Sequence, residues 1–157
     1  MDIILFTQED PFYLSESTYD LICKVKGSKH RIVKAIVSKA SPYGKNESFL
    51  KKTYKTFKIF GLKFFVYYLI KYLKRYTFSK TVSRVLKENN IDVLKINNSI
   101  NTSENERIIK SLNADLILII AGNQIIKKNI LQSTKYGVYN VHSSLLPKYK
   151  GLMPSFW

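Results

Sequence analysis

Short apolar runs alternate with longer mixed segments along most of the chain. Runs at 2–7, 31–38, 92–96 and 115–120 have the length and composition of β-strands. The run at 2–7 is apolar throughout much of its length, which is typical of a strand buried on both faces of a parallel sheet. A further short apolar stretch lies within 136–142 and leads directly into a polar loop. We therefore predict five strands.

The segments between these runs have the start and stop signals of helices. Pro11 can begin a helix that Gly27 ends, and a second helix is predicted over 79–90, where two asparagines stop it. Ser103, with Glu106 three residues later, predicts a capped helix that runs to residue 112. Because strands and helices alternate, we predict an α/β fold: one Rossmann-like, doubly wound domain over 1–157 with a mostly parallel sheet.

The loop after the first predicted strand lacks a glycine-rich phosphate-binding pattern. A dinucleotide needs glycines at that turn, because only they let the backbone approach the pyrophosphate closely. A dinucleotide-binding function is therefore disfavoured.

The break Ser-Pro-Tyr-Gly at 41–44 ends the second strand and precedes an insertion at about 45–78. This insertion has helical propensity and is dense in Tyr, Phe and Lys. It could be an amphipathic helix or helix pair that packs its aromatic residues on the sheet or on a second subunit. It could instead lie on an anionic membrane surface, or hold the phosphates of an RNA or a nucleotide sugar. We favour the first interpretation, because a charged helix face is usually only a solvated face.

The formal net charge of +15 is concentrated in this insertion. No acidic residue occurs between Glu47 and Glu88, whereas that interval contains eleven Lys or Arg residues. The longest uninterrupted apolar run, at 64–70, is too short to span a bilayer and is flanked by Lys63 and Lys71. Attachment to a membrane is therefore the less favoured expectation.

The single cysteine excludes an intrachain disulfide and an all-cysteine metal site. We predict that Cys23 is a small buried apolar residue in a reducing compartment. The first residues are apolar for too short a stretch, and carry acids where a secretory signal would carry lysines, so we expect a cytoplasmic protein.

The candidate chemistry lies at the end of the last predicted strand. Asn140 and His142 are two residues apart, so they project from the same face of a strand at its carboxyl end, where open α/β sheets bind ligands. An amide NH₂ can donate to a developing oxyanion, and an imidazole can donate, accept or shuttle a proton near neutral pH. This pair suits acyl transfer. Alternatively, Asn140 only satisfies backbone groups and His142 is a solvated or capping residue.

The surrounding residues 115–154 resemble, without a gap, the core of the 10-formyltetrahydrofolate-dependent formyltransferases. The matching features are a strand followed by Ala-Gly and Gln-Ile-Ile, a Tyr-Gly before the next strand, Asn-Val-His, and Ser-Leu-Leu-Pro-Lys-Tyr-x-Gly. The resemblance implies the formyltransferase version of the α/β fold, with the present chain as its amino-terminal part and the sheet incomplete at the C-terminus. It implies that 10-formyltetrahydrofolate is the formyl donor and that no metal is needed.

The resemblance also assigns roles to residues. It makes Asn140 and His142 catalytic, through hydrogen bonds to the formyl oxygen, and makes Ser143 and Ser144 shape the adjoining loop, with Ser144 at the family's motif serine. The remaining cofactor-binding residues border the slot for the pterin: Ala121, Gly122, Asn123, Gln124, Ile125 and Ile126. Asn123 stands where family members often have Gly, and Lys127 where many have Pro, so the loop's shape is not implied.

One catalytic group of the family has no counterpart in the chain. The family places an aspartate some tens of residues beyond the histidine, whereas this sequence ends at Trp157. Asp115 is a poor substitute because it lies at the opposite end of its strand. We therefore expect a fragment with little or no turnover.

The implied partners are the folate and a primary amine acceptor, either initiator tRNA or a nucleotide-linked amino sugar, with a possible homodimer. The alternative function is a non-catalytic basic module that binds RNA or an anionic membrane.

Overall fold

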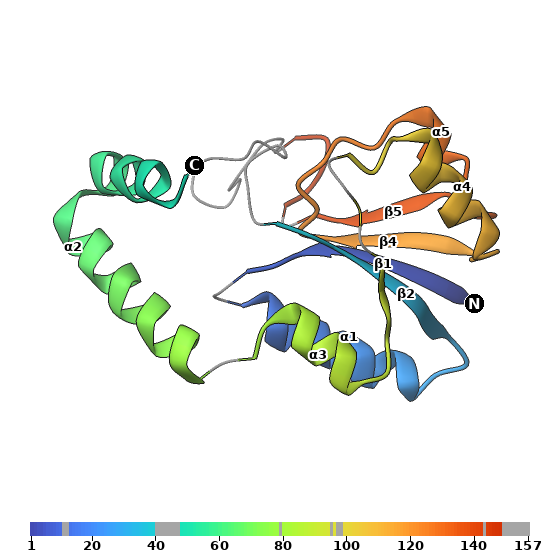
Figure 1. Cartoon of the computed structure of the whole chain (residues 1–157), viewed down its shortest axis with the longest axis horizontal. Helices are drawn as coiled ribbons and strands as arrows, with labels where there is room; N and C mark the ends of the chain where they lie inside the picture. The colour runs from blue at the N-terminus through green and yellow to red at the C-terminus, as the bar shows by residue number, and fades with distance from the viewer. Residues whose placement is uncertain are drawn as a thin grey trace.

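The computed structural model describes residues 1–10, 13–39, 48–78, 80–94, 96, 99–142 and 144–148. Five parallel strands form one sheet in the order β3-β2-β1-β4-β5 (Figure 1). The strands are β1 (Asp2–Gln8), β2 (Arg31–Ser38), β3 (Val93–Leu94), β4 (Leu116–Ile120) and β5 (Val138–Val141). Helices cover both faces of this sheet, so the prediction of a doubly wound α/β fold is confirmed.

Two hydrophobic clusters hold the helices against the sheet. One face packs on α1 (Leu14–Lys26) and α3 (Val82–Glu88), and the other on α4 (Ser103–Ser111) and α5 (Lys128–Leu131) (Figure 1). The central strand β1 supplies both clusters, because Ile4 and Phe6 point to one face and Leu5 to the other. All three are buried, which confirms a first strand covered on both sides.

The helix ends follow the sequence signals with one correction. The side chain of Thr102, not Ser103, caps α4 by accepting a hydrogen bond from the Asn105 N–H at 3.3 Å. Glu106 instead reaches Lys110 and Asn129, so the predicted capping box is wrong by one residue. Pro11, the expected start of the first helix, lies outside the described residues, as do the break at 41–44 and the first residues of the insertion.

The helices α3 and α4 both end at asparagines in a left-handed conformation. Asn90 has φ 60° and Asn113 has φ 48°, and asparagine adopts this region more readily than other residues with a side chain. Within the described part of the predicted third strand, Ala35 pairs with Val93 and Ile36 with Leu94.

Cys23 is exposed, so the prediction of a buried cysteine is wrong. The helix α1 buries Ser15, Thr18 and Ile22, which are spaced three and four residues apart and therefore share one face. Cys23 follows Ile22 directly and is rotated away from that face.

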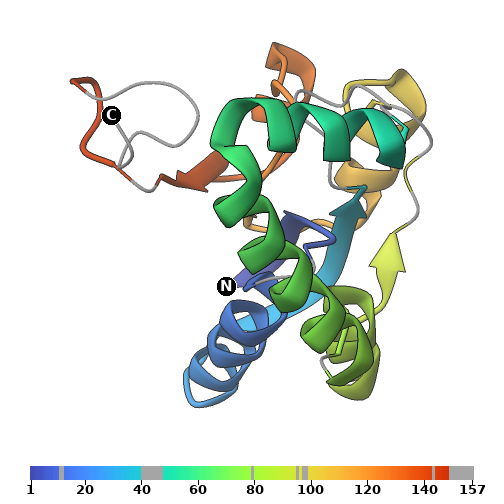
Figure 2. The same ribbon diagram turned by 90° about the vertical axis from the view of Figure 1, so that its left-hand side faces the viewer.

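The insertion forms α2 (Phe49–Phe78), a helix interrupted at Gly61, where φ is 76° and ψ is 177°. Figures 1 and 2 show α2 beyond the carboxyl ends of the strands. Among the described residues, neither core cluster includes an α2 residue. Its rings stack along the helix instead: Phe64 lies 4.4 Å from the ring of Phe60 and 4.4 Å from that of Tyr68. The aromatic side chains of α2 that the structure describes therefore lie outside the two core clusters. No helix within the described part of the chain is long and apolar enough to cross a membrane.

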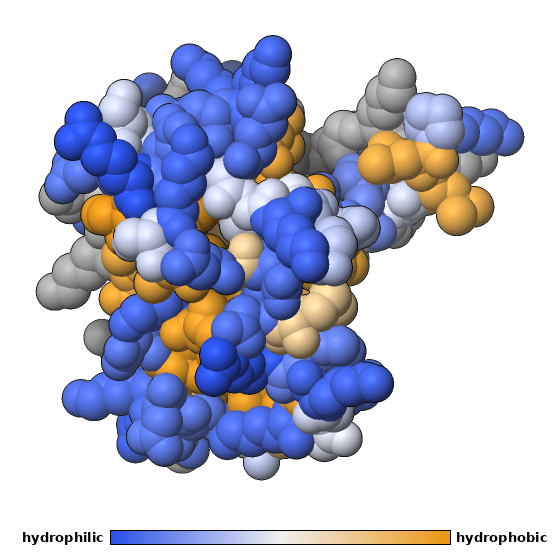
Figure 3. All heavy atoms as spheres, turned by 90° about the vertical axis from the view of Figure 1, so that its right-hand side faces the viewer, coloured by the Kyte–Doolittle hydropathy of each residue, from blue (hydrophilic) through white to orange (hydrophobic). Residues whose placement is uncertain are grey.

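The opposite side of the molecule, at the amino ends of the strands, is largely hydrophilic (Figure 3). Arg31 pairs with Asp2 at 2.6 Å, and Lys34 pairs with Asp92 at 2.6 Å, so cross-strand ion pairs lie along β1, β2 and the start of β3. Hydrogen bonding to Arg31 lowers the pKa of Asp2, and hydrogen bonding to Lys34 lowers that of Asp92.

These carboxylates predict that the protein is destabilised by acid. A group whose pKa is lower in the folded state contributes stability above its unfolded pKa and loses that contribution as pH falls through the folded value. Since the ordinary aspartate value is 3.8, the melting temperature should begin to fall near pH 4 and continue downward. Thermal melts from pH 7 to pH 3 test this. Asp2→Asn should reduce the fall in melting temperature at acid pH, whereas Asp20→Asn on the exposed side of α1 should leave that fall unchanged.

Candidate functional site

The carboxyl edge of the sheet contains the point at which the strand order reverses. The chain passes from β1 to β2 and β3 on one side, then returns to place β4 and β5 on the other side of β1. In α/β proteins ligands bind at such a switch point, beyond the carboxyl ends of the two strands on either side of it, which here are β1 and β4. In the register, Ile119 lies beside Asn140 and Ile120 beside Val141. The turn after β4 and the end of β5 are therefore neighbours on this edge.

Asn140 and His142 both lie outside the core at this edge. Phe6, Ile119 and Asn140 are aligned on adjacent strands and so face the same side, that of α4 and α5. The side chain of Asn140 is exposed, because β5 extends beyond the cluster that buries Phe6 and Ile119. His142 follows β5 directly and is half-buried. The two residues that the sequence singled out thus remain accessible to a ligand.

The imidazole of His142 is oriented by Ser144. The Ser144 backbone N–H donates to His142 Nδ1 at 3.3 Å, and the Ser144 hydroxyl lies 2.9 Å from the same nitrogen. A backbone N–H can only donate, so Nδ1 must carry a lone pair, and the neutral ring carries its proton on Nε2. His142 therefore presents an N–H donor on the side away from Ser144. Ser143 lies outside the described residues.

Replacing Ser144 by Ala should weaken this preference without unfolding the protein. The substitution removes the hydroxyl that lies on Nδ1 but keeps the backbone N–H. We expect ¹⁵N NMR of the ring nitrogens to show the Nε2–H tautomer in the wild type and a larger Nδ1–H population in Ser144→Ala. An identical tautomer ratio in both proteins would show that the hydroxyl does not orient the ring.

The turn after β4 is close-packed. A Cβ on Gly122 would lie 2.4 Å from Cγ2 of Ile119 and 3.5 Å from the ring of Phe6, so only glycine fits. Ala121 has φ 54°, a left-handed conformation that costs energy for a residue with a side chain. Unusual backbone conformations of this kind are concentrated at ligand sites. The Ala121–Gly122 pair therefore lies in a close-packed turn with an unusual backbone conformation.

The two residues at which the sequence departs from the family pattern both support the next part of this loop. Asn123 Nδ2 donates to the carbonyl of Lys39 at 2.7 Å, and Asn123 Oδ1 accepts from Ser38 at 2.8 Å. The backbone N–H of Lys127 donates to Asn101 Oδ1 at 2.7 Å, a bond that a proline cannot make. The loop is thus tied to the end of β2 and to the segment before α4 by groups that Gly and Pro do not provide.

The other pterin-slot residues have mixed environments. Gln124 Oε1 accepts a hydrogen bond from the Ile100 N–H at 2.8 Å, and the Ile125 carbonyl accepts one from Asn101 at 2.9 Å. The side chain of Ile125 is 77% exposed, whereas Ile126 packs against the core on the α4 side. Ile125 therefore projects to the surface, while Ile126 helps to hold the loop on the sheet.

Sequence reasoning missed Glu9, which follows β1 at the switch point. Its carboxylate accepts hydrogen bonds from the backbone N–H groups of Val82 at 3.1 Å and Ser83 at 2.9 Å, at the start of α3. Negative charge is favourable at a helix amino terminus, so Glu9 anchors α3 to the carboxyl edge. The only sequence signal was an acid directly after a buried strand.

Two other expectations concern acidic residues and metals. Asp115 Oδ2 accepts a hydrogen bond from the Asp2 N–H at 2.7 Å, which places it at the amino edge and confirms that it lies away from His142. In the part of the chain that the structure describes, no group of three His, Cys, Asp or Glu side chains is arranged to hold a metal ion.

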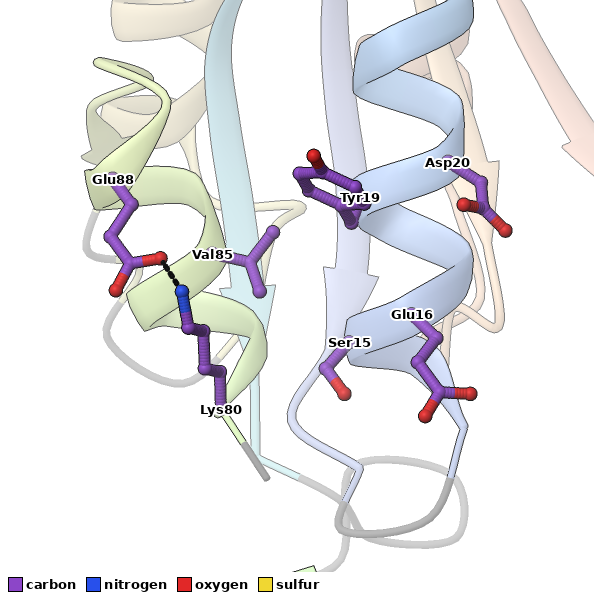
Figure 4. A pocket seen from close by; sticks show the side chains of 7 residues that line it. All are labelled: Ser15, Glu16, Tyr19, Asp20, Lys80, Val85 and Glu88. Atoms are coloured by element: carbon purple, nitrogen blue, oxygen red, sulfur yellow. Dashed lines mark hydrogen bonds and ion pairs between the residues drawn. The ribbon is translucent and has the colours of Figure 1, made fainter. Parts of the chain in front are cut away.

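A groove of about 360 Å³ lies between α1 and α3 (Figure 4). Lys80 and Glu88 form an ion pair at its side, and Tyr19 of α1 lies across from them. Hydrogen bonding to Cys23 raises the pKa of Tyr19, and hydrogen bonding to Lys80 lowers that of Glu88. None of the residues that line this groove belongs to the β4 turn or to β5, so it is separate from the candidate site.

The arrangement at the carboxyl edge agrees with a comparison of the sequence with known families. The model of the formyl transferase family matches residues 15–157, which is most of the chain. The chain belongs to the formyl transferase family.

Curated relatives in this family are methionyl-tRNA formyltransferases. The chain is 47% identical over 72 residues to that of Clostridioides difficile, an alignment that covers 45% of this chain and 22% of the relative. It is 45% identical over 58 residues to that of Agathobacter rectalis, covering 37% of this chain and 19% of the relative. The alignments thus span about a fifth of these formyl transferases.

Solved structures in the family share the fold. Phosphoribosylglycinamide formyltransferase from Anaplasma phagocytophilum superimposes with a TM-score of 0.58 at 13% identity, over 99% of this chain and 56% of that protein. Glycinamide ribonucleotide transformylase 1 from Symbiobacterium toebii gives a TM-score of 0.56 at 12% identity, over 99% of this chain and 57% of that protein. The chain therefore corresponds to just over half of the length of these folded domains.

Proposed function

We propose that this chain binds 10-formyltetrahydrofolate at the carboxyl edge of the sheet and takes part in transferring its formyl group to a primary amine. The observation that supports this most directly is the presence of two hydrogen-bond donors at the carboxyl end of β5 in a member of the formyl transferase family: the Asn140 amide, whose residue is aligned with Ile119 of β4, and the Nε2–H of His142, which follows β5. A transferred acyl group needs donors of this kind at its oxygen.

The donor set fits the folate's formyl group. When bound, 10-formyltetrahydrofolate supplies a formyl carbon attached to a nitrogen that can leave. Asn140 and His142 would donate to the formyl oxygen as negative charge grows there. The amine nitrogen would form its bond to carbon, the bond from carbon to N10 would break, and the proton lost by the amine would end on N10. Donors placed before the reaction stabilise this charge without reorganisation.

The loop over residues 121–126 suits the flat pterin. Its backbone is held on one side by Asn123 and on the other by Asn101, so its peptide groups are positioned before a ligand arrives. Fixed backbone groups can recognise the polar edges of a heterocycle without dedicated side chains. Residues 121–126, with Ser144, remain the proposed cofactor-binding residues.

Removal of the amine proton requires a base. The carboxylates of Glu9 and Asp10 lie at this edge but already accept hydrogen bonds from the starts of α3 and α1, so we expect neither to take the amine proton. Among the described residues, the contacts of the His142 ring are made by Ser144, while Asp115 lies at the amino edge. We therefore expect the 157-residue chain to bind the folate but to show little or no turnover. Steady formylation of an amine by this chain alone would contradict that expectation.

Folate binding is tested by calorimetry and by thermal melting of the chain. A ligand that binds only the folded state raises the free energy of unfolding by about 2.7 kcal/mol at a concentration 100 times its Kd. We expect 10-formyltetrahydrofolate to raise the melting temperature, and p-aminobenzoylglutamate, which lacks the pterin, to have no effect. The absence of both a binding heat and a shift in melting temperature with the folate would reject the proposal.

The proposed acceptor is a primary amine near a phosphate, as in an initiator tRNA or a nucleotide-linked amino sugar, and the proposed location is the cytoplasm. Binding of tRNA releases counterions from many phosphates, so its affinity should fall steeply with salt, whereas a nucleotide sugar should show a shallow dependence. Binding measured between about 50 and 200 mM salt separates the two acceptors.

The charge of α2 favours one alternative function, a non-catalytic basic module. If His142→Ala leaves cellular function intact while charge reversals at Lys51, Lys52, Lys55 and Lys58 abolish it, this alternative replaces formyl transfer. The opposite pattern supports the formyl transfer proposal.

A further inference from the structure

The second arm of α2, residues 62–78, has two different apolar sides. One side is half-buried and aromatic, with Phe64, Phe65 and Tyr68 packed in ring contacts along the helix. Lys71 joins this side to the domain, because its ammonium hydrogen-bonds to the hydroxyl of Tyr13 and lies 4.3 Å from the centre of that ring. The aromatic side is therefore the side that faces the domain.

The other side is aliphatic and exposed. Its residues are spaced three and four apart, which places them on one stripe of a helix. All of them are between 41% and 64% exposed: Leu62, Val66, Leu69, Ile70 and Leu73. Isolated exposed leucines are ordinary, but five aliphatic residues in one continuous stripe indicate a binding surface.

The first arm also exposes apolar side chains, two of them aromatic, and one of these, Phe57, contacts the ring of Phe65 on the second arm. Leu50, Tyr54 and Phe57 are exposed at helical spacing, and Lys51 and Lys58 lie beside them along the helix. Figure 2 shows both arms in front of the strands, so α2 lies at the carboxyl end of the sheet. On the second arm, Lys63 follows Leu62 and Lys74 follows Leu73, so basic residues lie beside the aliphatic stripe.

The positive charge of α2 favours one kind of binding partner for its exposed aliphatic stripe. Eight of the 30 residues of α2 are basic and none is acidic: Lys51, Lys52, Lys55, Lys58, Lys63, Lys71, Lys74 and Arg75. A second copy of the helix would bring two sets of like charges together, which disfavours self-association through this face. An RNA would contact the lysines but would leave the aliphatic stripe in water. A bilayer with anionic headgroups accepts both parts, since acyl chains bury the stripe and headgroups pair with the lysines.

We propose that α2 is an interfacial helix that docks the domain on the surface of an anionic membrane. The helix lies along the headgroup boundary and does not cross the bilayer, consistent with lysines distributed along its whole length. Long lysine side chains can extend from the apolar boundary to the headgroups. The helix α2 lies on the side of the molecule toward which the carboxyl ends of the strands point (Figure 1).

Flotation of the whole chain with lipid vesicles tests the proposal. We expect binding to vesicles that contain phosphatidylglycerol, weaker binding at high salt, and little binding to pure phosphatidylcholine. The double variant Leu69→Gln, Leu73→Gln should bind at least about tenfold more weakly, because each side chain loses contact with the acyl chains. Leu131→Gln is the matched control, because Leu131 is a comparably exposed leucine (45%) on α5, and it should bind as the wild type does.

Fluorescent labelling gives a second measurement that does not depend on weakened binding. Cys23 is the only cysteine and is exposed on α1, so a label on the wild type reports a position away from α2. With anionic vesicles, the fluorescence emission of a label at residue 69, introduced as Leu69→Cys with Cys23→Ser, should shift to shorter wavelength. The emission of the label on Cys23 should not shift.

Three results would overturn the proposal. The first is the absence of binding to anionic vesicles. The second is tight binding of single-stranded RNA that lysine substitutions abolish and Leu69→Gln, Leu73→Gln leaves unchanged, combined with unshifted fluorescence at residue 69. The third is a dimer in sedimentation analysis that the same double variant dissociates, which would assign the stripe to a second copy of the chain.

Discussion

Replacing Asn140 by Ala is expected to slow formyl transfer by about 10²–10³-fold, the usual effect of removing one oxyanion donor. The exposed amide at the end of β5 contributes little to the fold, so the loss should appear in kcat and not in the melting temperature. Because we expect neither Glu9 nor Asp10 to take the amine proton, the assay uses a fusion in which the Clostridioides difficile relative supplies the rest of the family's length. The rate of formylation of that relative's amine acceptor is then measured with and without the substitution.

Two further variants separate catalysis from structural damage. Val141→Ala alters an exposed residue on the opposite face of the same strand and should keep the wild-type rate. His142→Gln retains an N–H donor near the position of Nε2, so it should be less impaired than His142→Ala. A rate for Asn140→Ala within about threefold of the wild type would mean that the amide is not the proposed oxyanion donor.

The order of the elements and the location of the site could be predicted from the sequence because they depend on local patterns. A strand such as β1 is recognisable by its continuous apolar residues, and the position of Asn140 at a carboxyl edge follows from strand alternation and parallel topology. The exposure of Cys23 could not be predicted in this way. It depends on which face of α1 meets the sheet, and residues such as Ser15 and Thr18 on that buried face do not look apolar.

The shape of the loop after β4 depended on contacts distant in sequence. Asn123 binds groups at the end of β2, and Lys127 binds Asn101, 26 residues earlier. Without the fold, each residue appeared only as a departure from a family pattern. With the fold, each supplies a hydrogen bond that the usual residue cannot make. Predictions from sequence therefore fail where the shape of a loop depends on hydrogen bonds to residues that are distant in the sequence.

Gly122→Ala is expected to destabilise the protein by about 1–3 kcal/mol, the range observed for overpacked cores. The added methyl carbon would meet Ile119 Cγ2 at 2.4 Å. That atom cannot swing aside easily, because it belongs to a β-branched side chain that is 5% exposed on β4. Relief must come from movement of the turn, so folate binding should weaken together with stability. Urea unfolding measures the first effect and calorimetry with 10-formyltetrahydrofolate the second.

The neighbouring residue provides the control for this substitution. Ala121 has φ 54°, so Ala121→Gly removes a left-handed strain while adding freedom to the unfolded chain. These effects oppose each other, and we expect a net change of no more than about 1 kcal/mol. If Ala121→Gly lowered the free energy of unfolding as much as Gly122→Ala does, the loss could not be assigned to the contact between the added methyl group and Ile119. A negligible loss for Gly122→Ala would show that the turn can move away from Ile119, and a preformed pterin slot would then have no structural basis.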